Sequence, residues 1–197
     1  NNSVPFIFKA SFDKANRSSI ESYRGPGIKN SIQIFEAIKK ELDIPIITDI
    51  HEQGQIKEIS EVVDILQIPA FLCRQTDLIN AACQTQLPLN IKKGQFLSPG
   101  QMQNIIDKCK SFGNDNIILC ERGSSFGYDN LVVDFLGISK QKSYSYPIIL
   151  DVTHSLQLPG GRGSSAGGRS HQAEDLALAA TALSISGLFI EVHPDPD

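Results

Sequence analysis

Cationic and hydroxyl side chains crowd one short stretch of the sequence, FKASFDKANRSS, at residues 8–19. The stretch opens like a buried strand and then brings together Lys9, Lys14, Arg17 and several serines. Arginine binds phosphate and carboxylate through a planar fork, and lysine binds them as a point charge. Asn16 and Ser18 could add donors to an anion. The stretch therefore predicts an anion site, and the alternative is a polar loop whose hydroxyls cap the next helix.

Further cations follow later apolar runs, at Lys92, Lys93 and Arg122. Together with the cations of the first stretch they would form a strongly anion-binding group. The net charge of −4 does not oppose this, because the electrostatic field of such a group is local. This number of cations predicts that the site binds two anionic groups and not one.

Carboxylates and imidazoles form a second set of candidate residues. Such groups at neighbouring strand ends could hold a divalent metal or transfer protons. Their spacing matches no metal motif, so hydrogen bonding among themselves is the alternative. The set consists of Asp49, His51, Asp151, His154, Glu191, His193 and Asp195.

A glycine- and serine-rich stretch, PGGRGSSAGGRS at residues 159–170, is the third feature. It is not a Walker loop, because no Gly-Lys-Ser/Thr follows the glycines. Its basic residues, Arg162 and Arg169, favour a mobile lid over a bound ligand. An ordinary flexible connector is the alternative.

Seven apolar runs of strand length could position these residues. Helical stripes lie between them, as at residues 28–42, 102–109 and 175–185, with Gly113 as a helix stop. Strand and helix in alternation predict a parallel sheet with right-handed crossovers. Each run carries a polar or ionisable residue near its carboxyl end or is followed by one, which favours a (β/α)8 barrel over a doubly wound sheet. The runs are VPFIF, IPIIT, DILQI, LPLNI, NIILC, YPIIL and GLFIE.

A barrel of this class has eight strands, and the sequence predicts seven. We therefore expect an α/β (β/α)8 TIM barrel whose first strand and last helix are missing from the chain. The whole of residues 1–197 would be a single barrel domain, truncated at both ends. An open barrel would expose two unpaired sheet edges, which are a liability. A seven-stranded barrel is the less favoured alternative.

Composition excludes several classes of protein. A net charge of −4 argues against nucleic acid or an anionic membrane as a partner. No apolar run approaches the roughly 20 residues of a membrane span. We expect no signal peptide. We expect a cytoplasmic protein with reduced, buried thiols, because its cysteines lie within or beside apolar runs and show no CxxC spacing. These are Cys73, Cys83, Cys109 and Cys120.

Several longer stretches closely resemble the 3-deoxy-D-manno-octulosonate 8-phosphate synthase family. They include the stretch at residues 8–19 and the segments TDIHE, LQIPAFLCRQTDL, NIKKGQFLSPGQM, ERGSSFGYDNLVVDFLG, DVTHSLQ and GLFIEVHPDP. The related heptulosonate 7-phosphate synthases are less similar, especially at KANRSS and QIPAFLCRQTDL. The resemblance implies a homotetrameric barrel. That enzyme, a transferase, condenses phosphoenolpyruvate, arabinose 5-phosphate and water into the eight-carbon sugar acid phosphate and phosphate.

The resemblance also implies roles for individual residues. Asp49, His154 and Lys14 would be catalytic. Arg74 and Gln75 would reach the sugar phosphate of a neighbouring subunit, and Asn16, Arg17 and Ser18 would bind it within the chain. The implied phosphoenolpyruvate ligands are Lys9, Lys14, Gln67, Phe71, Lys92 and Arg122.

Metal dependence divides this family. His154 and Glu191 match two ligands of the metal-dependent class, whereas its cysteine would precede residue 1 and its aspartate would follow residue 197. QLPGG is typical of the metal class, and SPGQM and AGGRSHQ are typical of the other. We expect an enzyme without a metal cofactor, with a divalent ion as the alternative. The rival functions are a related phosphoenolpyruvate-dependent synthase and a non-catalytic sugar-phosphate-binding barrel.

Overall fold

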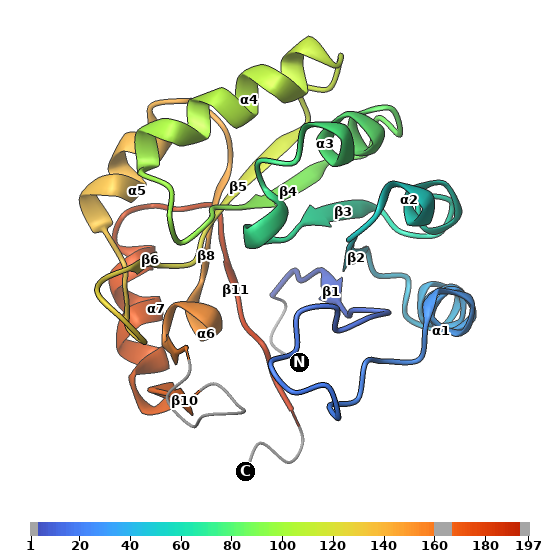
Figure 1. Ribbon diagram of the computed structural model, residues 1–197, viewed down its shortest axis with the longest axis horizontal. Coiled ribbons are helices and arrows are strands. Elements are labelled where there is room, and N and C mark those ends of the chain that lie inside the picture. Colours follow the sequence, from blue (N-terminus) through green and yellow to red (C-terminus); the bar gives the residue numbers. More distant parts are fainter. Residues whose placement is uncertain (1–3, 160–166, 194–197) are drawn as a thin grey trace. The chain divides into compact units, whose positions relative to one another are not determined.

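The computed structural model describes residues 4–159 and 167–193 (Figure 1). Arg162, Asp195 and the tip of the 159–170 stretch lie outside the described residues, so the expected lid is not described. The described part of that stretch includes β10 (Gly167–Gly168). This strand pairs antiparallel with β9 (Gln157–Leu158), which lies just before the stretch.

Seven strands form one sheet, and their order in the sheet is their order along the chain. A doubly wound sheet would instead reverse its strand order at a switch point. Neighbouring strands in this sheet run parallel, as β2 and β3 do where Ile47 pairs with Ile65, and β5 and β8 where Leu119 pairs with Ile148. The strand order confirms the expected α/β fold of the (β/α)8 barrel type. The strands are β1 (Phe8–Lys9), β2 (Ile46–Asp49), β3 (Ile65–Ile68), β4 (Leu89–Lys92), β5 (Ile117–Glu121), β8 (Ile148–Asp151) and β11 (Gly187–Phe189).

The three segments with apolar stripes contain helices, and further helices form where no stripe was predicted. The stripe at 28–42 forms α1 (Ile28–Leu42) in full, and Gly113 follows α4 with a φ of +83° that favours glycine. The 175–185 segment becomes helical two residues earlier, at Ala173, and its helix ends at Thr181. The other helices are α2 (Gln53–Ile59), α3 (Thr76–Cys83), α4 (Met102–Ser111), α5 (Phe135–Lys142), α6 (Val152–Ser155) and α7 (Ala173–Thr181), with 3-10 turns η1 (Ala70–Leu72), η2 (Pro99–Gln101) and η3 (Ser170–Gln172).

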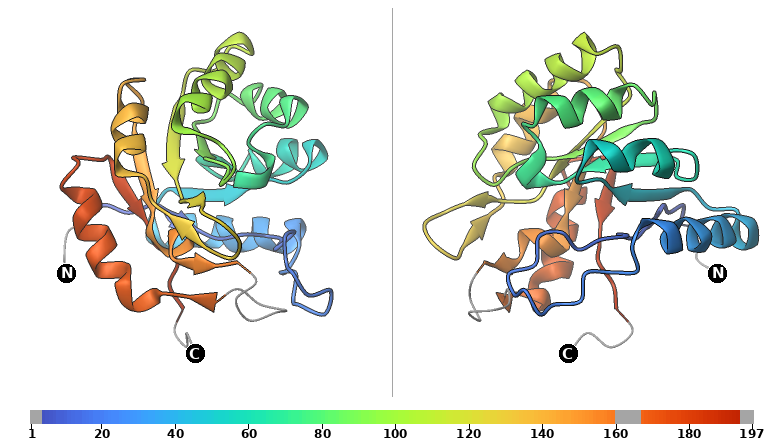
Figure 2. Two further views of the ribbon diagram at one scale, coloured as in Figure 1. Left: turned by 60° about the vertical axis from the view of Figure 1, so that its left-hand side comes forward. Right: turned by 45° about the vertical axis from the view of Figure 1, so that its right-hand side comes forward.

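The chain forms two compact units. The first unit comprises residues up to Ile91 together with residues 106–117, and the second comprises residues 92–105 and those from Ile118 onward. In the first unit α1, α2 and α3 lie side by side along β2 and β3 (Figures 1 and 2). β2 and β3 are buried at every position, which explains why their sequences are continuous apolar runs without alternation.

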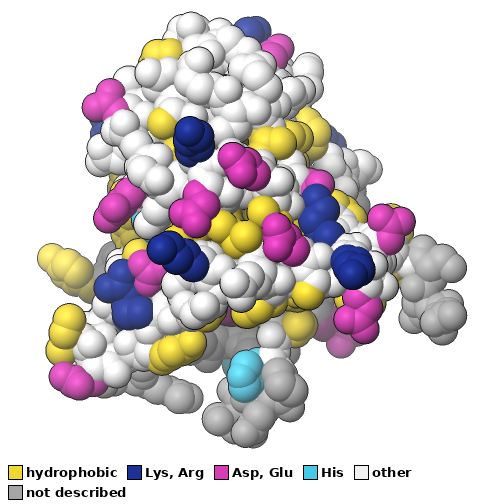
Figure 3. Space-filling view, turned by 90° about the vertical axis from the view of Figure 1, so that its right-hand side faces the viewer, with side chains coloured by type: hydrophobic (Ala, Val, Ile, Leu, Met, Phe, Trp, Pro, Cys, Tyr) yellow, Lys and Arg dark blue, Asp and Glu magenta, His cyan; other side chains and the backbone are white. Residues whose placement is uncertain are grey.

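A second short ladder in the second unit joins β6 (Ser124–Ser125) to β7 (Leu131–Val132). All four cysteines are buried and outside any disulfide, as expected. Within residues 4–159 and 167–193, no helix is long and apolar enough to cross a membrane. On the face shown in Figure 3, Lys and Arg side chains are interspersed with Asp and Glu side chains and do not gather by sign.

Candidate active site

One group of polar side chains lies at the carboxyl ends of β1 and β2, in the first unit. Lys9 is the last residue of β1, and its Nζ lies 3.1 Å from Oδ1 of Asp49, the last residue of β2. His51 Nε2 lies 2.9 Å from the other oxygen of the same carboxylate. Parallel pairing of β1 with β2 brings the cation and the imidazole to one acid. The sequence-predicted Asp49 is therefore the centre of a Lys9–Asp49–His51 group.

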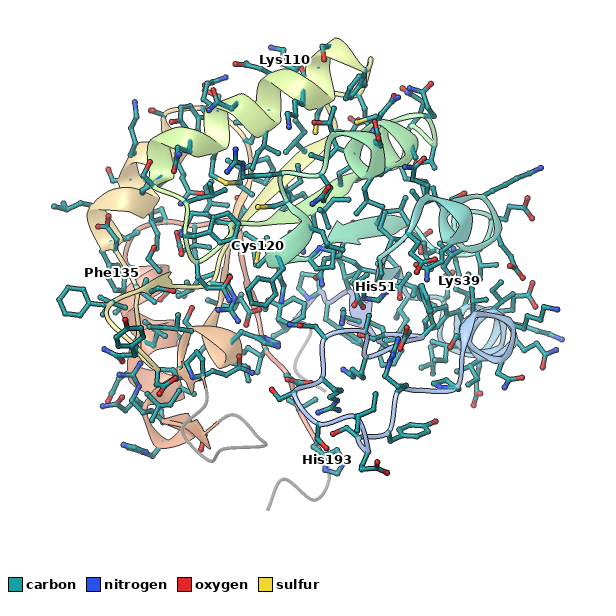
Figure 4. All side chains as sticks on the ribbon, viewed as in Figure 1. Lys39, His51, Lys110, Cys120, Phe135 and His193 are labelled. Carbon is teal, nitrogen blue, oxygen red and sulfur yellow. The ribbon has the colours of Figure 1, made fainter. Side chains whose placement is uncertain are left out.

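Opposing effects act on the pKa of Asp49. Burial alone would raise it, but the hydrogen bond to His51 and the charge of Lys9 together hold the pKa of this carboxyl well below its usual range. Asp49 is thus an anion at neutral pH. His51, labelled in Figure 4, meets Phe12 edge to face, with 5.7 Å between ring centres. The buried Nδ1 of His51 has no hydrogen-bond partner among the described residues.

The cation-rich stretch after β1 forms a loop with a closed base. Asp13 accepts two hydrogen bonds from Arg24, from Nε at 2.7 Å and Nη2 at 2.6 Å, and the Lys14 N–H donates to the Arg24 carbonyl at 2.5 Å. Gly25 follows with a φ of +114°, and a Cβ there would lie 2.7 Å from the Phe12 carbonyl oxygen. A cavity of about 290 Å³ adjoins this base. The predicted sugar-phosphate ligands on the loop, all three exposed, are Asn16, Arg17 and Ser18.

A row of polar side chains crosses β2, β3 and β4 in register. Asp49 lies opposite Gln67, and Gln67 lies opposite Asn90. The buried Gln67 Oε1 accepts from Asn90 Nδ2 at 3.2 Å. Asn90 was not predicted as a site residue, although it stands in the polar position of the apolar run LPLNI.

The segment after β3 is open to solvent. Phe71, expected to line the phosphoenolpyruvate site, is 56% exposed on η1, and Arg74 and Gln75 are exposed just before α3. Lys108 of α4 holds this segment, because its Nζ donates to the Arg74 carbonyl at 3.0 Å and to Thr76 Oγ1 at 2.8 Å. The exposed position of Phe71, Arg74 and Gln75 suits contact with another molecule.

The second group of polar side chains belongs to the second unit. Lys92, at the end of β4, is buried and donates a hydrogen bond to Asp151, at the end of β8. The Lys92 ammonium also lies 4.0 Å from the centre of the Phe189 ring, a cation–π contact. The sequence does not distinguish Phe189 from the other apolar residues of its strand.

Asp151 also fixes His154. Its carboxylate accepts from the backbone N–H of His154 at 2.9 Å and lies 2.9 Å from His154 Nδ1. Burial alone would raise the pKa of Asp151, but the charge of Lys92 and the hydrogen bond to His154 hold it well below its usual range. The other ring nitrogen of His154, Nε2, lies 3.7 Å from Glu191 Oε2.

Arg122 lies just after β5 and is 6% exposed. Its Nη2 donates to Gln157 Oε1 at 3.3 Å, and its buried Nη1 has no hydrogen-bond partner within the described ranges. Burial lowers the pKa of Arg122, and the charge of Asp151 acts against this effect. Asp151 thus acts electrostatically on both Lys92 and Arg122.

Lys93 differs from the other predicted cations because it is fully buried. Its Nζ donates to Ser124 Oγ at 2.9 Å and to the Leu97 carbonyl at 3.3 Å, and it lies 3.4 Å from Glu121 Oε1. Lys9, Lys92 and Lys93 are each partnered by a carboxylate, a feature that the composition of the strand ends did not predict.

The family model described as "DAHP synthetase I family" matches residues 1–197. The chain belongs to this family. Its relatives include proteins from Hahella chejuensis and Shewanella baltica, which are 59% and 60% identical over 98% of this chain and 69% of each relative. A protein from Pseudomonas fluorescens is 59% identical over the same shares. All three are named 2-dehydro-3-deoxyphosphooctonate aldolase, which confirms the resemblance seen in the sequence motifs.

Proposed function

We propose that this member of the DAHP synthetase I family condenses phosphoenolpyruvate with D-arabinose 5-phosphate and water. The products are 3-deoxy-D-manno-octulosonate 8-phosphate, a precursor for lipopolysaccharide, and inorganic phosphate. The observation that carries the proposal is the 58–60% identity, over 98% of the chain, to proteins named for this octonate. In the reaction C3 of phosphoenolpyruvate attacks the sugar aldehyde, water adds at C2, and phosphate leaves by C–O cleavage.

The second unit supplies cations suited to phosphoenolpyruvate. This substrate carries a phosphate and a carboxylate, and Arg122 offers a buried Nη1 with no protein acceptor among the described residues. Lys92 is held by Asp151 and by the ring of Phe189, so its charge is fixed in position before the substrate binds. Fixed cations in a water-poor environment stabilise developing charge without reorganisation. We assign Lys92 and Arg122 to phosphoenolpyruvate, and His154 to proton handling or to orienting the water.

The first unit supplies a loop suited to the sugar phosphate. The side chains of Asn16, Arg17 and Ser18 are exposed on a loop whose base is closed by Asp13 and Arg24. An arginine fork flanked by an amide and a hydroxyl matches a phosphate monoester. In the same unit we assign Lys9, Lys14, Gln67 and Phe71 to phosphoenolpyruvate, and Asp49 to catalysis.

Oligomerisation is part of the proposal. Arg74 and Gln75 are exposed, and Lys108 fixes the backbone of their segment. We infer that they contact the sugar phosphate bound by a neighbouring subunit of a homotetramer. The buried, unbridged thiols agree with a cytoplasmic enzyme.

We also propose that the enzyme needs no metal. The motifs SPGQM and AGGRSHQ are typical of the class without a metal. His154 Nε2 and Glu191 Oε2, which lie 3.7 Å apart, are the two positions that match ligands of the metal-dependent class. If a divalent ion binds, these two residues would hold it, and the ion would polarise a substrate oxygen or its bound water. We expect EDTA to leave the rate of phosphate release unchanged. Loss of activity that Mn²⁺ restores would contradict the proposal.

Phosphate release measures the substrate choice directly. The full-length enzyme is mixed with phosphoenolpyruvate and either arabinose 5-phosphate or erythrose 4-phosphate. We expect kcat/KM to favour arabinose 5-phosphate by about 100-fold or more, since buried polar groups discriminate strongly against a substrate that leaves them unpaired. Preference for erythrose 4-phosphate would assign the chain to heptulosonate synthesis. Binding of both substrates without phosphate release would indicate a non-catalytic protein.

A further inference from the structure

The carboxylate of Glu121 lies at the centre of a buried polar network that the proposed chemistry does not use. Glu121 is the last residue of β5 and is 1% exposed. Unlike Lys92 and Arg122, it offers no positive charge to an anion. A buried carboxylate is costly unless its oxygens are well partnered, so its partners indicate what it does.

One oxygen of this carboxylate holds the backbone that follows. Glu121 Oε1 accepts from the N–H of Arg122 at 2.9 Å and from the N–H of Gly123 at 2.8 Å. The chain turns at Gly123, which has a φ of +87°. A Cβ at this position would lie 3.3 Å from Leu131 Cβ. Glu121 therefore fixes the direction in which Arg122 leaves the strand.

Two side chains hold the carboxylate in turn. Gln141 of α5, which is fully buried, donates from Nε2 to Glu121 Oε2 at 3.0 Å. The Lys93 ammonium lies 3.4 Å from Oε1, and the Lys93 backbone N–H donates to the Cys120 carbonyl at 2.8 Å. Glu121 is thus fixed from β5, from α5 and from the end of β4. A buried ion pair is weak evidence for stability, so the network needs another reason.

We propose that Glu121 is a positioning residue that directs the Arg122 guanidinium toward an anionic group of phosphoenolpyruvate, with Lys93 and Gln141 as its supports. The inference rests on the proposed function and adds residues that do not touch the substrate. Arg122 has one Nη bonded to Gln157 and the other without a protein acceptor among the described residues, so its orientation decides whether an anion meets both. Bidentate recognition depends on that geometry.

Glu121→Gln tests this role with little change in shape. The amide oxygen can still accept the two backbone N–H groups, but Lys93 would lose its counter-charge, and Gln141 would have to turn its amide to accept from the new NH2. We expect the KM for phosphoenolpyruvate to rise about 10- to 100-fold, as misplacement of a binding group does. The KM for arabinose 5-phosphate should change less than about two-fold, because the network touches none of its assigned ligands.

Asp64→Asn is the matched control. Asp64 also pairs with a lysine, Lys39 at 2.7 Å, and accepts a backbone N–H, that of Ile46 at 2.8 Å, but it contacts none of the assigned ligands. It should lower the Tm and leave both KM values unchanged. An unchanged KM for phosphoenolpyruvate in Glu121→Gln would overturn the positioning role, as would equal increases in both KM values.

A second variant restores the donor and acceptor pattern. In Glu121→Gln with Gln141→Glu, the new amide can donate to the new carboxylate, and we expect part of the affinity for phosphoenolpyruvate to return. If Glu121→Gln does not fold, Gln141→Met, which removes one donor, carries the test. It should raise the KM for phosphoenolpyruvate about three- to ten-fold through a smaller displacement of Arg122. No change there would equally overturn the inference.

The wild-type enzyme separates the two hypotheses. If it releases no phosphate from phosphoenolpyruvate and arabinose 5-phosphate, the proposed function fails and the positioning role fails with it. If the wild type is active and Glu121→Gln binds phosphoenolpyruvate normally, only the positioning role fails.

Discussion

The Lys92 ammonium donates a hydrogen bond to the Asp151 carboxylate, which has no exposed surface. These residues are 59 positions apart and belong to the ends of two different strands. Each charge compensates the other at a position that is largely buried. Removing either partner leaves an uncompensated buried charge.

Lys92→Met and Asp151→Asn should each lower the free energy of unfolding by about 3–5 kcal/mol for this reason. The double variant should lose less than the sum of the single losses by at least about 1 kcal/mol, because residues in contact are coupled. Urea unfolding of the four proteins measures this coupling. Strict additivity would show that the pair contributes nothing specific.

Arg122→Ala should lower kcat/KM by about 100- to 1,000-fold, the usual loss for a donor that stabilises transition-state charge. Steady-state phosphate release measures the effect. Lys110→Ala is the matched control, since Lys110 is exposed on α4 (Figure 4) and should have normal kinetics. Near-normal kcat/KM in Arg122→Ala would refute its assignment to phosphoenolpyruvate.

Arg17→Ala should impair the use of the sugar phosphate selectively. Arg17 is exposed on the loop closed by Asp13 and Arg24, and a charge-assisted contact to phosphate contributes about 1.5–3 kcal/mol, or roughly 10- to 150-fold in KM. The KM for arabinose 5-phosphate should rise by this factor and the KM for phosphoenolpyruvate should not change. Lys29→Ala, another exposed cation of the same unit, should alter neither constant. An unchanged KM for the sugar in Arg17→Ala would exclude its role.

Asp49 should make the stability of the protein sensitive to acid. Its pKa is held below the ordinary value of 3.8, so its contribution is complete above that pH and is lost as the pH falls through 3.8 toward the lowered pKa. Asp49→Asn lacks this contribution at every pH. The difference in unfolding free energy between wild type and variant should be constant from about pH 7 to 5 and shrink between about pH 5 and 3. A difference that stays constant down to pH 3 would show that the carboxylate is not specifically stabilised.

Local pattern was enough to predict the sheet and the main helices. Apolar runs of strand length and the stripe at residues 28–42 depend on spacing within a few residues, and burial on both faces removes polar alternation. The two-residue strands of the β6–β7 and β9–β10 ladders were not predicted, since segments so short carry no periodic signal.

Lys92 and Lys93 are both buried, and which partners each of them meets could not be read from the sequence. Lys92 and Lys93 are adjacent, and neighbouring side chains of an extended chain point to opposite sides. Lys92 meets Asp151 and Phe189, whereas Lys93 enters the core beside Glu121. Pairings between distant strand ends follow from sheet register and not from local spacing, so the carboxylate beside each lysine was not predicted.

The paired hydrogen bonds between Asp13 and Arg24 have a consequence for how such enzymes diverge. A loop fastened at its root can change its tip residues while the strands beneath it keep their register. Natural or laboratory selection for a sugar of another length would therefore first change the residues from Ala15 to Tyr23, which can be replaced together. Sugar specificity could then change during evolution while the fold of the barrel stays the same.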